Sequence, residues 1–228
     1  MLSAFSNSLR IPELRQRILF TFGIIFVCRL IAAVPTPGVD AVALREFMAM
    51  VRATAGGSFV GLFDLFSGGA LENCAVGALG VMPYISASII LQLMTAVVPA
   101  LERLAREGDT GRQKITQYTR YGTLGLAIFQ SLGIAVALES TAGLVLSPGF
   151  GFRLTTVVSL TAGTMFLMWL GEQITERGLG NGISILIFAG IAAGLPSAIG
   201  GLLELVRTGA MSIVASIFIV LLVGLVTY

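Results

Sequence analysis

The chain has 228 residues, of which 56% are hydrophobic and only 11% are charged, whereas ordinary soluble domains carry about 25% charged residues. Together with a mean hydropathy of +0.94, this composition indicates an integral membrane protein, and the net charge of +2 is too small to indicate a nucleic-acid-binding surface. Because the sequence contains no histidine, Ser-His and Cys-His catalytic pairs and histidine metal sites are excluded. We expect neither a metal nor a cofactor.

Six apolar runs are long enough to cross a membrane. In chain order they are residues 18–34, 74–98, 121–138, 154–174, 183–203 and 211–228. A helix needs about 20 apolar residues to cross the hydrocarbon core of a bilayer. The sequence therefore predicts an all-α integral membrane protein, a multi-helix transmembrane bundle with about six spanning helices.

The N-terminal region, residues 1–17, is predicted to be a cytosolic, amphipathic lead-in to the first span. Its arginines and the apolar run after them resemble a signal peptide, but the run is long for one and is interrupted by Arg29. A retained first helix fits better, in which Arg29 snorkels or pairs at a helix interface. The polar residues 35–58 then form an external loop, with a short helix around residues 42–52.

The apolar segment 59–66 is too short to span. Eight residues extend only about 12 Å as a helix, and Asp64 in the middle would cost about 2.5 to 3.5 kcal/mol at the bilayer centre. The chain then breaks at Ser67, Gly68 and Gly69. Because lipid cannot satisfy the backbone groups freed by such a break, the segment must be sheltered by protein or by a watery cavity.

Two helices carry pairs of branched aliphatic residues. Val81 and Ile85 are four residues apart, as are Ile183 and Ile187, so each pair shares one helix face. The first pair flanks Pro83, which is expected to kink a continuous helix over residues 74–98. This arrangement suits a pore lining, although the interior of a packed bundle also explains it.

Charge patterning predicts the orientation of the bundle. Nine basic residues fall near the helix ends on one side and four on the other, and the more basic side is cytoplasmic. Residues 99–120 then form a cytosolic loop that turns at Gly108. A solvated hairpin and a partner-binding surface both remain open for it. A second cytosolic turn, residues 171–182, has three alternating glycines but lacks the spacing and the lysine of a nucleotide site.

Several stretches of this sequence resemble the SecY family, the channel subunits of the bacterial protein translocase. They are residues 33–40, 65–71, 78–93, 114–122 and 169–188, and the similarity covers essentially the whole chain. The resemblance implies an hourglass channel of two pseudo-symmetric halves of five helices. Residues 18–203 would be the first half, and residues 204–228 would start the second half with helix six. Because the last apolar run ends at Tyr228 without a polar flank, we expect the chain to be truncated.

The resemblance also implies roles for individual residues. A short re-entrant plug helix would occupy about residues 58–71, and a lateral gate would release hydrophobic segments into the membrane. The expected pore ring is Val81, Ile85, Ile183 and Ile187; the plug residues are Leu62, Phe63, Asp64, Leu65, Phe66, Ser67, Gly68 and Gly69; the gate residues are Ser86, Ile89, Gln92 and Gln130; and the cytosolic partner loop presents Arg103, Arg106, Arg112 and Lys114.

The implied function is non-enzymatic passage of unfolded preproteins across the bacterial cytoplasmic membrane, with the N-terminus in the cytoplasm. The implied partners are SecE and SecG, the SecA motor ATPase or the ribosome, signal sequences and membrane lipids. A secondary transporter, which also uses broken helices, is the alternative. An intramembrane protease is excluded, because no histidine activates a serine and no second transmembrane aspartate pairs with Asp64.

Overall fold

The computed structural model describes residues 11–53, 67–71, 73–141, 143–209 and 212–227. These residues form helices joined by turns, with two isolated β-bridges, Pro35 to Ala75 and Val39 to Val145. The helices are α2 (Pro12–Ala33), α3 (Ala41–Ala53), α5 (Met82–Val97), α6 (Pro99–Arg106), α7 (Asp109–Ser140), α8 (Phe150–Arg177), α9 (Gly182–Arg207) and α10 (Ile213–Thr227). The all-α prediction is confirmed.

Four helices in the described part of the chain are long and apolar enough to cross a membrane. They are α2, α7, α8 and residues Gly182–Glu204 of α9, and the pair α5 and α6, bent by 100°, would make a fifth span. Helix α10, where a sixth span is predicted, has 15 described residues, fewer than the 18 that this criterion requires. The protein is thus a multi-helix membrane bundle, as the composition predicts.

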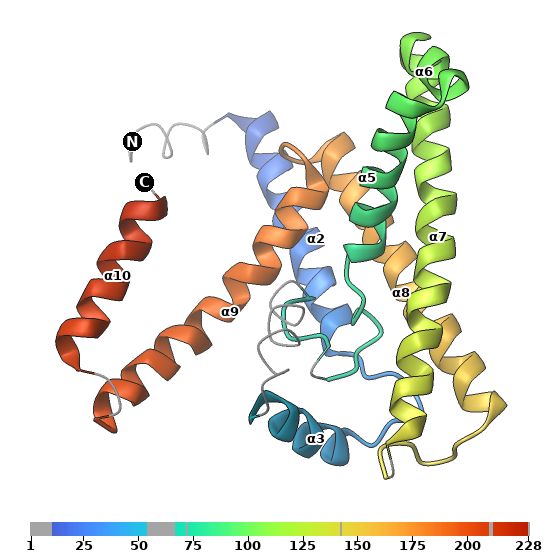
Figure 1. The fold of residues 1–228 in the computed structure, drawn as a ribbon. Helices are drawn as coiled ribbons and strands as arrows, with labels where there is room; N and C mark the ends of the chain where they lie inside the picture. The colour runs from blue at the N-terminus through green and yellow to red at the C-terminus, as the bar shows by residue number, and fades with distance from the viewer. Residues whose placement is uncertain (1–10, 54–66, 72, 142, 210–211, 228) are drawn as a thin grey trace.

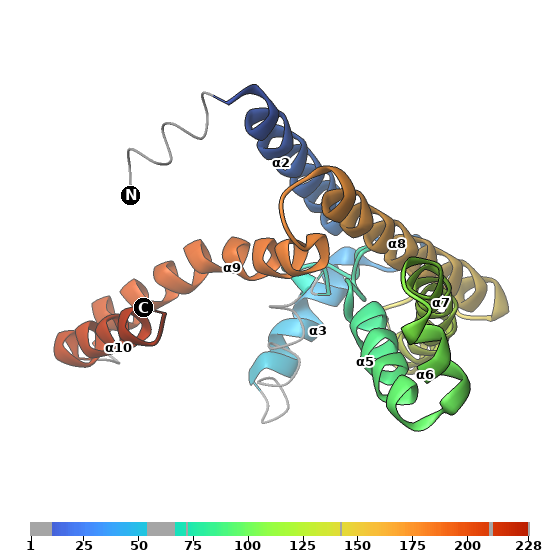
Figure 2. The same cartoon turned by 90° about the horizontal axis from the view of Figure 1, so that it is seen from above.

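Helix α8 forms the back of the bundle and packs against α7, α9 and α2. Half of its most apolar stretch is buried, a larger share than in α2, α7 or α9. Helix α3 lies across one end of the bundle and α6 caps the other, and these ends are called here the α3 end and the α6 end (Figure 1). The distal part of α9 and all of α10 extend away from α5, α7 and α8, as Figure 2 also shows.

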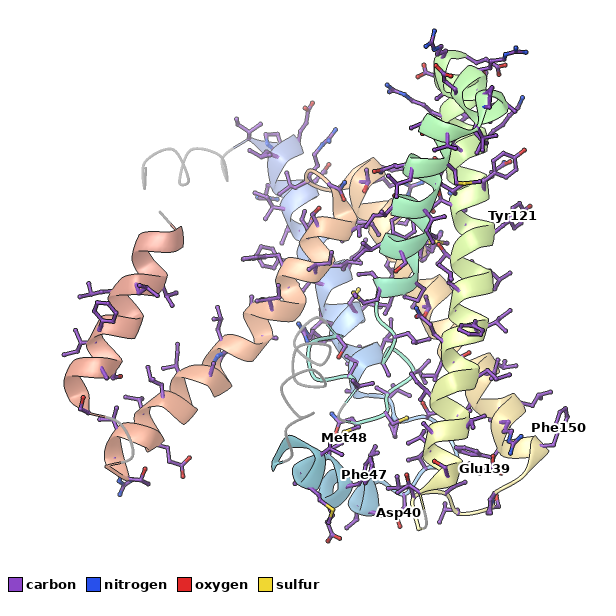
Figure 3. All side chains as sticks on the ribbon, in the orientation of Figure 1. Asp40, Phe47, Met48, Tyr121, Glu139 and Phe150 are labelled. Carbon is purple, nitrogen blue, oxygen red and sulfur yellow. The ribbon has the colours of Figure 1, made fainter. Side chains whose placement is uncertain are left out.

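The short helix expected around residues 42–52 is present as α3. Leu44 is buried and joins Cys74, Leu138, Leu144 and Phe152 in one apolar cluster, against which Phe47 and Met48 pack from the same helix. Figure 3 shows Phe47 and Met48 on α3 at this end of the bundle, with Asp40 at its start. Asp40 Oδ1 accepts from the backbone N–H of Val42 at 2.8 Å, which satisfies one of the free donors of the first turn.

The predicted continuous helix over residues 74–98 is wrong at its start. Residues 74–81 form successive turns, and α5 begins only at Met82, so Pro83 occupies the first turn instead of kinking a helix. Proline is well tolerated there because its missing N–H would have no partner in any case. The turns need left-handed backbone, with φ of 42° at Cys74 and 56° at Gly80, which a continuous helix could not contain.

Both predicted cytosolic turns are shorter than expected, because helices extend into them. Within residues 99–120 the chain forms α6 and the first three turns of α7, and it reverses at Gly108 with a φ of 78°. The predicted turn position is therefore right, while the loop around it is helical. Likewise α8 continues to Arg177, so that residues 178–181 alone connect α8 to α9.

Close backbone contact joins α8 to the turns before α5. A Cβ atom built on Gly163 would lie 2.1 Å from the carbonyl oxygen of Val76, so a side chain there cannot coexist with the observed packing. Gly163 itself is buried on α8. The glycine therefore sets how closely the non-helical segment lies against the back of the bundle.

We predict that Gly163→Ala destabilises the fold by about 1 to 3 kcal/mol, the usual cost of overpacking a close contact. Gly133→Ala on α7 is the matched control, since a Cβ there meets no atom within 4 Å and alanine favours a helix by up to about 1 kcal/mol. The measurement is the fraction of full-length protein that stays monodisperse in detergent after heating. Equal losses in both variants would contradict the proposed close contact.

Candidate functional site

The four aliphatic residues predicted from their spacing lie in one cluster. Val81 is 8% exposed and belongs to the buried part of that cluster, and Ile85, Ile183 and Ile187 pack against it. The remaining buried members come from α2, α8 and α9 and are Ile24, Leu167, Leu170, Ile174 and Leu186. Residues about a hundred positions apart in the chain are thus brought together where the start of α5 faces the start of α9.

Backbone hydrogen bonds of the non-helical segment place the first pair. The N–H of Val76 donates to the carbonyl of Val34 at 2.9 Å, and the N–H of Ala75 donates to the carbonyl of Ala70 at 2.8 Å. The first α5 hydrogen bond then runs from the N–H of Ile85 to the carbonyl of Val81 at 3.1 Å. The position of Val81 and Ile85 is therefore anchored to the end of α2 as well as to α5.

Side-chain acceptors in and around the 178–181 turn place the second pair. Asn181 caps α9 by accepting from the N–H of Ser184 at 3.2 Å, and Thr175 Oγ1 accepts from the N–H of Gly182 at 2.9 Å. Thr21 on α2 accepts from the N–H of Leu179 at 3.3 Å. Because these acceptors come from α2, α8 and the turn itself, the first turn of α9 has a defined position relative to the two neighbouring helices.

Two glycines allow α8 and α9 to approach each other closely. A Cβ on Gly182 would lie 1.9 Å from the carbonyl oxygen of Gly171, and a Cβ on Gly171 would lie 2.4 Å from Cδ1 of Ile183. Ile183 therefore packs directly on backbone that carries no side chain. Small residues at helix crossings commonly permit this distance in membranes.

The predicted gate residues on α5 are partly exposed. Ser86 is half-buried, Ile89 is 51% exposed, and Gln92 is exposed, its side chain donating to Ser88 Oγ at 3.4 Å. They recur every third residue, so they lie along one flank of the helix.

Gln130 lies at a different level of the bundle. Helices α5 and α7 meet where Gly122 faces Ala87, with a Cβ on Gly122 3.4 Å from that of Ala87. Gln130 is eight residues further along α7, about 12 Å toward the α3 end, whereas Ile89 and Gln92 lie on the α6 side of that contact. The structure places the four predicted gate residues on two packed helices but does not gather Gln130 with Gln92.

Most of the predicted plug lies outside the described residues, namely Leu62, Phe63, Asp64, Leu65 and Phe66. Its end is described, because Ser67, Gly68 and Gly69 form a turn in which both glycines have positive φ. Arg29 Nη1 donates to the carbonyl of Gly68 at 3.0 Å. The sequence indicated that Arg29 pairs at a helix interface or snorkels, and the structure shows an interface contact.

The charged side chains of the α6 end are exposed. Arg103, Arg106, Arg112 and Lys114 are accessible on α6 and the start of α7, and Arg106 pairs with Glu102 at 2.6 Å. An exposed ion pair of this kind stabilises a fold by only about 0 to 1 kcal/mol. The positive charge of the α6 end is therefore available to a partner.

A bidentate contact between Arg120 and Glu172, at 2.9 and 2.8 Å, joins α7 to α8. It was not predicted. The only sequence signal for it is that Arg120 and Glu172 carry opposite charges and lie near the ends of the apolar runs 121–138 and 154–174.

The SecY family model matches residues 75–228. The chain is 53% identical to protein translocase subunit SecY of Escherichia coli K12 over 219 residues, which are 95% of this chain and 48% of the relative. The corresponding proteins of Buchnera aphidicola and Pseudomonas aeruginosa are also 53% identical, over 95% and 97% of this chain and 60% and 49% of their own lengths. The chain thus spans about half the length of the curated relatives it matches.

We predict that Thr175→Val loosens the α8 to α9 turn, because valine keeps the shape of threonine but cannot accept from Gly182. Losing one hydrogen bond of about 1 kcal/mol should raise the rate of trypsin cleavage after the exposed Arg177 about fivefold. Thr155→Val is the control, since the Thr155 hydroxyl bonds to the Gly151 carbonyl of its own helix. Mass spectrometry of digests of the detergent-solubilised full-length protein measures cleavage at this one site. An equal increase in both variants would argue against the assigned contact.

Proposed function

This chain belongs to the SecY family of protein translocase subunits, and from that premise we propose that it forms the first half of the central pore of a Sec translocase. The pore passes unfolded preproteins across the membrane and releases hydrophobic segments sideways into it. The protein is a channel and not an enzyme. Residues 18–203 form the five-helix half, and residues 204–228 begin the second half with the sixth helix.

The observation that carries this proposal is the aliphatic cluster that α2, α8, the start of α5 and the start of α9 form together. A channel for unfolded chains must admit every kind of side chain, so its constriction cannot depend on specific hydrogen bonds. Val81, Ile85, Ile183 and Ile187 offer apolar, branched surfaces that disfavour water and ions when the channel is closed. The same surfaces adapt to a passing chain without holding any one residue tightly.

The broken segment before α5 provides the second seal. Residues 58–71 form a plug that blocks the resting channel, and the glycines at 68 and 69 allow it to swing aside. Ser86, Ile89, Gln92 and Gln130 border the lateral gate. A signal sequence shifts the equilibrium from closed to open because it contacts the open gate better than the closed one.

The orientation follows from the basic residues. The α6 end, which carries Arg103, Arg106, Arg112 and Lys114, faces the cytoplasm of a bacterial cell, and the α3 end faces outward. The cytoplasmic surface binds the SecA motor ATPase or the ribosome. SecE and SecG complete the membrane complex.

The structure does not favour the alternative of a solute transporter. Such proteins bind their substrate near mid-membrane depth, in pockets of about 300 to 1,000 Å³ for ligands of drug size. The cavity beside Arg29 has a volume of about 50 Å³, which is too small for such a solute.

Reconstitution tests the function directly. The full-length protein, purified with its partner subunits and placed in proteoliposomes with SecA and ATP, is expected to protect a preprotein with an intact signal sequence from added protease. No protection above that seen with empty liposomes would reject the proposal.

We predict that Ile85→Asn or Ile187→Asn raises the resting ion conductance of the reconstituted channel roughly tenfold, equivalent to about 1.4 kcal/mol of barrier, because a polar side chain wets the constriction. Both variants should also export preproteins with weakened signal sequences. Ile128→Asn on α7 is the control, since this residue is 43% exposed and lies outside the cluster. Unchanged conductance and unchanged signal stringency would contradict the ring assignment.

A further inference from the structure

Arg29 places a guanidinium group in the apolar helix α2, four residues before the helix ends at Ala33, where a cation is unfavourable without partners. It is half-buried, and within the described part of the chain no carboxylate pairs with it. Its two terminal nitrogens donate instead to two backbone carbonyls. Nη1 donates to Gly68 at 3.0 Å, and Nη2 donates to Ala189 on α9.

The two acceptors belong to different parts of the proposed channel. Gly68 lies in the turn that ends the plug region, 39 residues from Arg29 in the chain, and Ala189 lies two residues after Ile187, 160 residues from Arg29. Because the guanidinium is planar, with donors in a fixed fork, one side chain fixes the turn and α9 at a defined separation. A lysine, with one compact ammonium group, cannot reproduce this geometry.

The turn is shaped around this contact. Gly68 has a φ of 67°, and a Cβ built on it would lie 2.5 Å from Nη1 of Arg29. The neighbouring Gly69 also has a positive φ, of 86°, but a Cβ there meets no atom within 4 Å. Both positions require a left-handed backbone, while Gly68 alone also requires the absence of a side chain so that the guanidinium can reach the carbonyl.

A small cavity lies next to the guanidinium. It has a volume of about 50 Å³ and is lined by Arg29, Ser67, Val81, Leu186 and Gly190. This is enough space for at least one water molecule, which needs about 10 to 15 Å³ by this measure. Water there can accept from the remaining donors of the guanidinium.

We propose that Arg29 is a positioning residue that clasps the end of the plug region to α9 and thereby holds the channel closed. Separating the 67–69 turn from α9 breaks one of the two hydrogen bonds that Arg29 donates. The channel therefore opens in the same step in which Arg29 releases one of its acceptors. The clasp also couples the two seals, because Ala189 follows Ile187 of the constriction on the same helix. This inference rests on the proposed channel function and assigns a role to a residue outside the ring, the plug and the gate.

Arg29→Gln tests the clasp in the full-length channel complex in planar bilayers. Its resting ion conductance is expected to rise about tenfold, the shift in the open-to-closed ratio expected when a charge-assisted hydrogen bond is lost from the closed state. Arg29→Lys should give a smaller rise, because it keeps the charge and loses the fork. Export of a preprotein with an intact signal sequence should remain at least at the wild-type rate, whereas a merely structural defect would lower it.

Two glycine substitutions provide a matched pair that leaves Arg29 in place. Gly68→Ala should raise the conductance as Arg29→Gln does. Gly143→Ala, which lies outside the ring, the plug and the gate and whose Cβ meets no atom within 4 Å, should not, although both substitutions strain a left-handed backbone. The double variant Arg29→Gln with Gly68→Ala should conduct no more than either single variant, because both remove the same contact. If Arg29→Gln fails to assemble with the partner subunits, the glycine pair still decides the question.

Wild-type conductance in Arg29→Gln, equal conductance in the two glycine variants, or additive effects in the double variant would overturn the clasp. A wild-type complex that translocates normally while the clasp test fails leaves the proposed function standing. A wild-type complex that does not translocate rejects the proposed function itself.

Discussion

Backbone at membrane depth must have hydrogen-bond partners within the protein, because lipid offers none. Within the segment 67–81, described apart from residue 72, several backbone groups find such partners in the elements around it. Val34 accepts from Val76, the Thr36 N–H and hydroxyl both donate to the Cys74 carbonyl, at 3.0 and 2.6 Å, and Arg29 donates to Gly68. These hydrogen bonds tie the end of α2 to the stretch that leads into α5.

Helix α8 makes that arrangement possible, because its glycines leave room where other elements approach. Val76 lies against Gly163, and Gly182 lies against Gly171, each at a distance that any side chain would prevent. Buried, tightly packed backbone of this kind behaves as a rigid support. Within the proposed channel, α8 is therefore the fixed support for the elements packed against it.

Both seals of the proposed channel depend on weak and replaceable contacts. The proposed constriction is held by dispersion between aliphatic side chains, and the energy of each contact is small. Because these contacts are not specific, the constriction closes without preferring any one substrate. The clasp uses two hydrogen bonds to backbone carbonyls, which water or a passing chain can replace. A closed state maintained by a few kilocalories per mole is one that a signal sequence can overcome through modest differential binding.

The sequence by itself determined the membrane class, most of the spans, the α3 helix and the turn at Gly108, since composition, run length and helical spacing report on local physics. It also identified the aliphatic pairs, because i and i+4 residues must share a helix face. It did not locate the start of α5, the helix α6 or the acceptors of Arg29. Only the tertiary structure decided these features, because they depend on which distant backbone groups need partners, and no local pattern encodes a hydrogen bond across 160 residues.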